Sequence, residues 1–333
     1  MERARRIIVS AIFYMLVSLG ALPLVWIAAP AHAAQQQLVA FWSPAAGGGA
    51  YVLVAGMVGT VNKRMPGGVT FVQEQTTGAL EGLRRLQLAH SQKKPGLADV
   101  STLDAWNAYN GEADYKGKPF PELRAVVFNQ FVDLYLAVPT NSPIKSWADL
   151  KGKRIGMGGP GSAVANVGHL ILDAYGVTRK DFKPYYYVFK ETAEGISDGS
   201  LDGGLFAGGY PIAAYLELST LRNVRIVPVE ERIAKKLIGE YPGVYQNVVK
   251  AKSYRGVEQD TPIMQWTGSV WTHAGVSNDL VYNFLKTLFD HKEEYYQIHR
   301  DARALTVENA TLTIRVPFHP GAEKFLKEVG SIK

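Results

Sequence analysis

Short apolar runs alternate with amphipathic stretches of helical length from residue 37 onward, and this alternation constrains the fold more than any other feature of the sequence. A strand predicted at 37–42 precedes a helix at 51–64, and a strand at 69–73 precedes a helix at 79–90. A third strand is predicted at 97–102. Strands that alternate with helices in this way build α/β units around a mostly parallel sheet.

The alternation restarts after two apolar runs, 123–128 and 134–138, which polar residues separate. Strands are then predicted at 154–157, 185–189, 201–206 and 224–229, and helices at 163–175, 191–198 and 212–221. The chain returns through an apolar, β-rich segment at 262–272 and closes with helices at 279–298 and 322–329.

We therefore expect an α/β protein of two lobes, each a mostly parallel sheet flanked by helices, joined by crossing strands. The first lobe is predicted to comprise 34–128 and 266–333, and the second lobe 129–265. A chain that crosses twice between two lobes can close around a ligand by a hinge movement. The predicted architecture therefore includes a ligand-binding cleft between the lobes.

The first 33 residues are expected to be an export signal. Arg3, Arg5 and Arg6 precede an apolar run at 7–27, and Ala31-His32-Ala33 supplies the small residues of a signal peptidase site. Cleavage after Ala33 predicts a periplasmic protein. An uncleaved membrane anchor is the alternative, because the run is nearly long enough to span a bilayer.

The composition argues against several kinds of site. The 333 residues include no cysteine, which excludes disulfides, thiolate nucleophiles and thiolate metal ligands. The net charge is +6, and about +4 without the leader, whose three Arg and one Glu leave 33 Lys+Arg and 29 Asp+Glu. The basic residues are scattered and lack the aromatic interleaving of a nucleic-acid surface. We expect no nucleic-acid partner, and a mild positive field that favours an anionic solute.

Two glycine-rich segments each lie between a predicted strand and a helix, at 43–51 and at 158–162. Glycine lets the backbone approach a ligand closely, and the N–H groups of the following helix favour an anion. A tight turn with Ser162 as an ordinary N-cap is the alternative for the second segment. Because ligands of open α/β sheets lie beyond the carboxyl ends of the strands, two such segments on facing lobes predict one shared cleft.

Other polar residues follow predicted strands and are candidates for the same cleft, with capping or packing as their alternative roles. These are the hydroxyl residues at 76–77 and 101–102, the amides at 129–130, and the Gly-Gly-Tyr segment after 206. The predicted ligand-binding residues are Ser43, Gly48, Gly49, Tyr51, Thr76, Thr77, Ser101, Thr102, Asn129, Gln130, Gly159, Gly161, Ser162, Gly208 and Tyr210.

No catalytic or metal-binding pattern is found. Ser162 lies in Gly-Pro-Gly-Ser-Ala, which is not the G-x-S-x-G nucleophile elbow. Neither glycine-rich segment spells a P-loop or G-x-G-x-x-G, and no histidine pair has H-E-x-x-H spacing. We predict that the protein is not an enzyme and uses no cofactor and no metal. An exported hydrolase or transferase is the alternative, and it would need a nucleophile with a base.

The chain resembles the TAXI family of solute receptors of tripartite ATP-independent periplasmic (TRAP) transporters. The similarity covers the mature chain and is carried by LKGKRI at 150–155, GGPGS at 158–162, DGSLDG at 198–203, FAGGYP at 206–211 and PFHPGA at 317–322. The resemblance implies a type II periplasmic-binding fold and a monomeric protein. It also implies a small organic acid, a carboxylate, as ligand, and the membrane permease subunits of a TRAP transporter as partners.

The sequence departs from the family where ligand contacts are expected. Pro44, Ala45 and Ala46 replace hydroxyl residues and glycines of the first glycine-rich segment. Asn129-Gln130-Phe131 replaces the residues that the family usually has where the chain crosses between the lobes. Each polar ligand group left unpaired costs about 1–3 kcal/mol. A more apolar or aromatic carboxylate therefore suits the site. The receptor of an ATP-driven importer and a ligand-sensing module remain alternatives.

Overall fold

The computed structural model of the protein describes residues 37–46, 48–312 and 314–333. The predicted signal peptide, 1–33, lies outside the described residues. So does Gly47 of the first glycine-rich segment.

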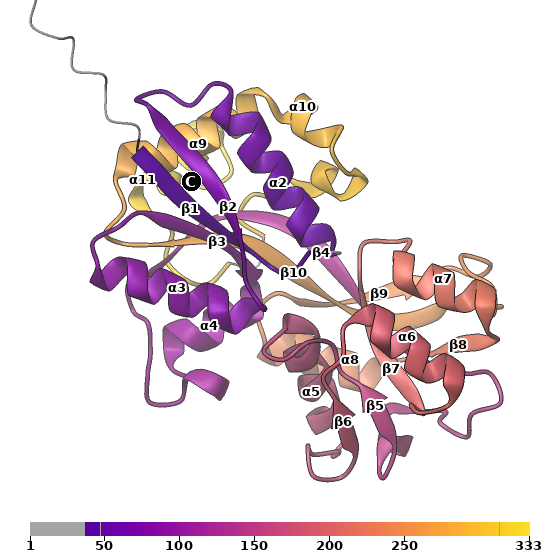
Figure 1. Cartoon of the computed structure of the whole chain (residues 1–333). Helices are drawn as coiled ribbons and strands as arrows, with labels where there is room; N and C mark the ends of the chain where they lie inside the picture. The colour runs from indigo at the N-terminus through magenta and orange to yellow at the C-terminus, as the bar shows by residue number, and fades with distance from the viewer. Residues whose placement is uncertain (1–36, 47, 313) are drawn as a thin grey trace, which may run out of the picture. The chain divides into compact units, whose positions relative to one another are not determined.

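Ten strands of the described residues form one sheet in the order β2-β1-β3-β10-β4-β7-β5-β6, with β8 added to β4 and β9 to β10 (Figure 1). The strands are β1 (Gln37–Ser43), β2 (Val69–Gln75), β3 (Gly96–Ser101), β4 (Leu123–Pro139), β5 (Arg154–Gly156), β6 (Lys183–Tyr185), β7 (Gly203–Gly208), β8 (Val224–Val227), β9 (Val244–Val249) and β10 (Thr261–His273).

Two long strands, β4 and β10, pair with each other antiparallel and change their outer neighbours along their length. At one end β10 pairs with β3, and at the other end β10 pairs with β9 while β4 pairs with β7 and β8. We call β1–β3 with 123–128 and 269–273 the first half-sheet. The second half-sheet comprises β5–β9 with 130–139 and 261–268.

The pairing confirms the predicted fold class. β1 is parallel to β2 and β3, and β5 is parallel to β6 and β7, whereas the crossing strands are antiparallel to their neighbours. The half-sheets meet at a bulge, because Gln130 pairs with Gly268 and Phe128 with Ser269, which leaves Asn129 without a partner in register. The predicted lobe boundaries fall within β4 and β10 and stay predictions.

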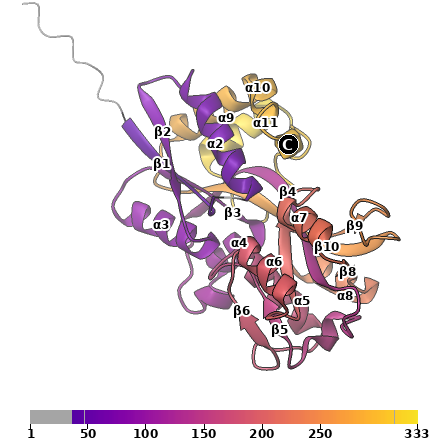
Figure 2. The same ribbon diagram turned by 45° about the vertical axis from the view of Figure 1, so that its right-hand side comes forward.

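Helices cover both faces of each half-sheet (Figure 2). α2, α9 and α11 bury one face of the first half-sheet around Phe41 and Phe284, and α3 and α4 bury the other around Trp271. α5 and α8 pack on one face of the second half-sheet, and α6 and α7 on the other. The helices are α2 (Gly49–Asn62), α3 (Ala79–Ser91), α4 (Thr102–Asn110), α5 (Ala163–Ala174), α6 (Phe189–Asp198), α7 (Ala213–Leu221), α8 (Glu231–Glu240), α9 (Asn278–Asp290), α10 (Lys292–Tyr296) and α11 (Pro320–Glu328), with 3-10 turns η1 (Ala113–Tyr115), η2 (Trp147–Leu150) and η3 (Arg300–Ala304).

Three local predictions are wrong. The strand predicted at 185–189 ends at Tyr185, because the backbone N–H of Val188 is capped by Glu191 and α6 begins at Phe189. The helix predicted at 279–298 breaks at His291, whose φ of −120° separates α9 from α10. Residue 102 begins α4 and does not end a strand, since the Ser101 side chain caps that helix. The sequence interpretation also missed α4, α8 and β9.

Candidate functional site

Three helices begin where strands of the two half-sheets end: α2 after β1, α5 after β5 and α7 after β7. None of the three carries an acidic residue in its first turn, whereas every other described α-helix carries at least one. A helix N-terminus presents unpaired N–H groups and a partial positive charge, and a local carboxylate would neutralise it. These three N-termini are therefore suited to an anion from outside.

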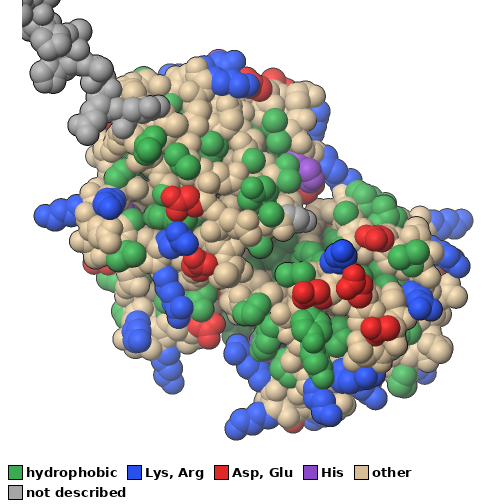
Figure 3. Space-filling view, viewed as in Figure 1, with side chains coloured by type: hydrophobic (Ala, Val, Ile, Leu, Met, Phe, Trp, Pro, Cys, Tyr) green, Lys and Arg blue, Asp and Glu red, His purple; other side chains and the backbone are tan. Residues whose placement is uncertain are grey.

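The strand-end segments of the two half-sheets contact each other directly. The backbone N–H of Leu80 donates to the carbonyl oxygen of Gly161 at 3.4 Å. A Cβ at Gly78 would lie 2.7 Å from the same oxygen, so only glycine allows this approach. A Cβ at Gly159 would meet no atom within 4 Å, which leaves this part of the segment open. Figure 3 shows the surface hollowed between the two parts of the molecule.

Two of the predicted hydroxyl residues cap helices. Ser162 Oγ accepts the N–H of Ala165 at 3.3 Å at the start of α5, and Ser101 Oγ accepts the N–H of Asp104 at 3.0 Å at the start of α4. These are capping roles that the sequence left as alternatives. Thr77 instead donates through its backbone and its hydroxyl to Glu81 in the first turn of α3, whose N-cap is Gly78. A role in ligand binding stays a prediction for all three.

Other predicted residues hold the strand ends together. The N–H and hydroxyl of Thr76 both donate to the carbonyl oxygen of Ser43, whose own hydroxyl accepts from Gln73 at 2.9 Å. Thr102 Oγ1 lies 3.0 Å from Ser269 Oγ. Ser43, Thr76 and Thr102 are all buried, so none of their side chains is presented at the surface, and a role in ligand binding stays a prediction for each.

The predicted amides lie at the bulge where the half-sheets meet. Asn129 donates to Asp99 and accepts the hydroxyl hydrogen of Tyr295 at 3.1 Å, and all three side chains are buried. Burial raises the pKa of Asp99 to about 7, against the opposing effect of the Asn129 hydrogen bond. Gln130 is 3% exposed and lies against Gly268, and its amide has no hydrogen bond to the described residues.

Asp301 of η3 lies between Gly49, at the start of α2, and Gly209, just after β7. The sequence analysis did not identify Asp301 as a candidate. A Cβ at Gly209 would overlap the Asp301 carboxylate, and a Cβ at Gly49 would lie 4.0 Å from its Oδ2. Asp301 Oδ2 is buried without a hydrogen bond, and burial raises the pKa of this carboxyl against the effects of His299 and Arg300. No local pattern identifies Asp301, because it belongs to a polar turn far in sequence from both glycines.

Asp133 of β4 lies beside this position, since it is paired in register with Gly208 and η3 packs against β4. The amides of Asn247 and Gln265 both donate to Asp133 Oδ1 at 2.8 Å. Burial raises the pKa of Asp133, and the charge of Asp301 acts in the same direction.

The remaining predicted residues border the same region. Gly48 is the N-cap of α2, and Tyr51 in its first turn accepts the side-chain amide of Gln73 at its carbonyl oxygen. Tyr210 is 38% exposed, donates its hydroxyl to the carbonyl oxygen of Ser253, and lies under the guanidinium of Arg300 at 5.4 Å. Tyr210 therefore packs locally and still presents part of its ring to the surface.

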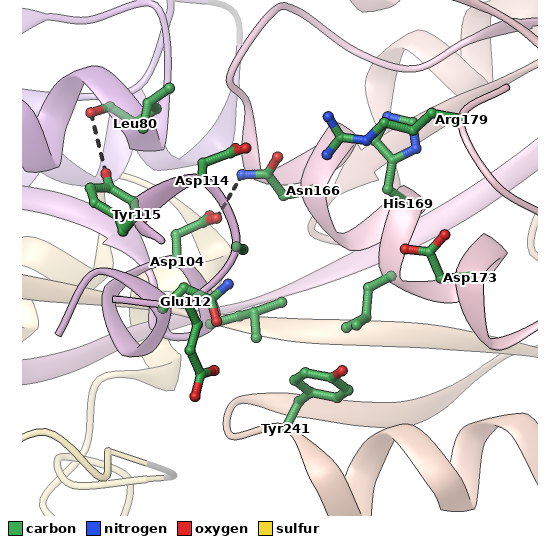
Figure 4. Close-up of a pocket in the computed structure, with 14 residues that line it drawn as sticks. Leu80, Asp104, Glu112, Asp114, Tyr115, Asn166, His169, Asp173, Arg179 and Tyr241 are labelled. Carbon is green, nitrogen blue, oxygen red and sulfur yellow. Dashed lines mark hydrogen bonds between the residues drawn. The ribbon is translucent and has the colours of Figure 1, made fainter. Parts of the chain in front are cut away.

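A cavity of about 250 Å³ lies beside the contact between the half-sheets, bounded by α4 and η1 on one side and α5 on the other (Figure 4). Asn166 of α5 donates to Asp104 of α4 across it at 2.7 Å. His169 is buried, and burial together with Arg179 lowers its pKa to about 4, so the ring is neutral. None of the predicted ligand-binding residues is among its lining residues, which are Leu80, Leu103, Asp104, Asn107, Glu112, Ala113, Asp114, Tyr115, Asn166, His169, Leu170, Asp173, Arg179 and Tyr241.

Among the described residues, no helix has the length and apolar character needed to cross a bilayer. No set of three or more His, Asp or Glu side chains in that part of the chain is placed to hold a metal ion.

The fold is shared with proteins of known structure. A structure described as a periplasmic transporter aligns with a TM-score of 0.53 at 13% identity, over 89% of this chain and 93% of that one. A Xanthomonas citri protein solved with ATP gives 0.50 at 12% identity, over 89% and 96%. The binding component of a phosphonate ABC transporter from Pseudomonas aeruginosa gives 0.50 at 11% identity, over 80% and 79%. The sequence itself matches the NMT1-like family over residues 43–330, and the chain therefore belongs to that family.

Proposed function

We propose that the protein is an extracytoplasmic solute-binding protein that captures a small organic anion, a carboxylate, in the cleft between the half-sheets. It delivers this solute to membrane permease subunits. The observation that carries the proposal is the set of three helix N-termini, α2, α5 and α7, that lack acidic residues and follow strand ends. Such N-termini bind carboxylates through backbone N–H groups and the helix dipole.

The finer proposal is a receptor of the TAXI type that serves a TRAP transporter, exported to the periplasm after cleavage near Ala33 and acting as a monomer without catalysis. The motifs at 150–162, 198–211 and 317–322 support this proposal. The receptor of an ATP-driven importer is the second candidate, because one protein of the same fold is the binding component of an ABC transporter. Transport in proteoliposomes distinguishes them: uptake driven by an ion gradient supports the first, and uptake that requires ATP supports the second.

A thermal-shift screen of organic acids, amino acids and their amine-free analogues tests the proposed function. A solute at about 100 times its Kd adds roughly 2.7 kcal/mol to the free energy of unfolding, which is a readily measured rise in Tm. We expect one chemical class of organic acid to raise Tm, with no conversion of the compound during incubation. Absence of any stabilising organic acid would contradict the proposal, and consumption of the compound would show an enzyme.

A further inference from the structure

One buried carboxyl group joins the two halves of the molecule. Asp104 lies in the first turn of α4, which packs on the first half-sheet, and Asn166 lies in α5, which packs on the second. The amide of Asn166 donates to Asp104 Oδ1 at 2.7 Å, and the hydroxyl of Ser101 donates to Oδ2 at 2.5 Å. Both oxygens of Asp104 therefore have a donor, and one of these donors comes from the opposite half.

The opposite half also keeps water away from Asp104. This residue is 5% exposed although it borders the cavity of about 250 Å³, whose other wall is α5 (Figure 4). Asn166, His169 and Leu170 belong to that wall. A rotation of the half-sheets away from each other would separate α5 from α4, break the Asn166 hydrogen bond and admit water to the carboxyl group. Closed and parted half-sheets therefore solvate Asp104 differently.

The first half of the molecule disfavours a charge on Asp104 while the half-sheets are closed. From this half, η1, its N-cap and α3 bring to the cavity Glu112, Ala113, Asp114, Tyr115 and Leu80. Burial raises the pKa of Asp104, and the negative charge of Asp114 acts in the same direction. The hydrogen bonds from Ser101 and Asn166 oppose this rise without cancelling it.

The second half does not compensate the charge. The titratable residues that it brings to the cavity are His169, Asp173, Arg179 and Tyr241. His169 is neutral, because burial and the charge of Arg179 lower its pKa to about 4. The guanidinium of Arg179 also acts on the exposed carboxylate of Asp173. Among the described residues, no cation is one of the groups that shift the pKa of Asp104.

We propose that Asp104 and Asn166 form a proton-dependent latch: Asp104 takes up a proton when the half-sheets close on each other, and its ionisation favours their separation. This inference rests on the proposed function and adds a regulation to it, since a cleft that closes better in acid retains its solute better there.

The direction of the pH dependence follows from the raised pKa of Asp104 in the closed arrangement. The latch is fully effective below the ordinary pKa of an aspartic acid, about 4, and its effect is lost as the pH rises through the raised value. Because one proton is involved, the ratio of closed to open molecules falls by up to about tenfold per pH unit between these two values.

The distance between two spin labels tests the latch without any solute. The sequence contains no cysteine, so Gln87→Cys on α3 and Lys180→Cys after α5 place one label at an exposed site in each half. Double electron–electron resonance then measures the distance between the labels on the mature chain at pH 5 and pH 8. We expect the short distance of closed half-sheets to predominate at pH 5. The ratio of short to long distances should fall at least about fivefold at pH 8.

Two variants and one control assign the effect to these residues. D104N keeps an oxygen that accepts from Asn166 but carries no charge, so its short-distance population should be as large at pH 8 as at pH 5. N166A removes the donor from α5 and should enlarge the long-distance population at both pH values. D279N is the matched control, because Asp279 also lies in the first turn of a helix, α9, but is exposed. It should behave as the wild type, and circular dichroism should show an unchanged fold for all three.

The outcomes separate the latch from the proposed function. A wild-type distance distribution that is the same at both pH values would overturn the latch, and so would a D104N chain that keeps the wild-type pH dependence. Solute capture would then stand, because no solute enters this measurement. Failure of every organic acid to raise Tm would instead contradict the proposed function, and the label distances would still decide whether the latch exists.

Discussion

The replacement D99N should stabilise the folded protein in a way that depends strongly on pH. Asp99 is buried in β3, and among the described residues its one hydrogen-bond donor is the amide of Asn129. Desolvation raises its pKa from 3.8 to about 7. The folded state therefore holds this proton between pH 4 and 7, where the unfolded chain has already released it.

The direction and size of the change in unfolding free energy with pH follow from this pKa difference. Stability from this group is fully present below pH 3.8, falls as the pH rises towards 7, and is constant above that value. A pKa raised from 3.8 to about 7 corresponds to roughly 4 kcal/mol of unfolding free energy lost by pH 8. Asparagine carries no charge and can still accept from Asn129, so D99N avoids this loss.

Urea unfolding of wild type and D99N at pH 4 and pH 8 measures the effect. The variant should have about the stability of the wild type at pH 4 and exceed it by up to roughly 4 kcal/mol at pH 8. The difference in unfolding free energy between the two proteins cancels the contributions of Asp104, Asp133 and Asp301, whose pKa values burial also raises. A stability difference that is the same at both pH values would refute the reasoning, because it would mean that burial does not shift Asp99.

Three further variants test the strand-end contacts and the bulge. S162A should weaken solute binding measured by calorimetry and cost about 1 kcal/mol of stability through the lost cap, and unchanged affinity would remove Ser162 from the site. G78A places a Cβ 2.7 Å from the carbonyl oxygen of Gly161, so it should reduce solute affinity. The control G59A has no atom within 4 Å of its Cβ and should leave affinity unchanged. Equal affinities of the two variants would contradict a close contact between Gly78 and Gly161. Y295F removes the donor to Asn129 and should lower the unfolding free energy by about 1 kcal/mol in urea titrations; no loss would show that this hydrogen bond contributes nothing.

Much of the fold could be predicted because periodicity and burial agree along the chain. The helix predicted at 79–90 is observed as Ala79–Ser91, since its apolar spacing matches the face buried against β3. The broken helix at His291 could not be predicted in this way. Its cause is tertiary: the turn brings Tyr295 into the core, where its hydroxyl meets Asn129.

The candidate site was only partly predictable. Strand ends and glycines are local signals, so the segment at 158–162 could be named from the sequence, whereas its contact with Gly78 was not predicted. Asp301 and Asp133 carry no such signal, because their proximity arises from the packing of η3 on β4. A hydroxyl at a strand end suits a helix cap as well as a ligand, so the sequence could not separate the two roles. Ser101 is observed as the cap of α4, and its role in ligand binding stays a prediction.

Native mass spectrometry of the mature chain, incubated with a mixture of small organic acids, tests the central claim most directly. The proposed cleft holds one solute, so the spectrum should show one added mass per chain. A spectrum without any retained acid, or with several acids bound at once, would contradict capture at one site between the half-sheets.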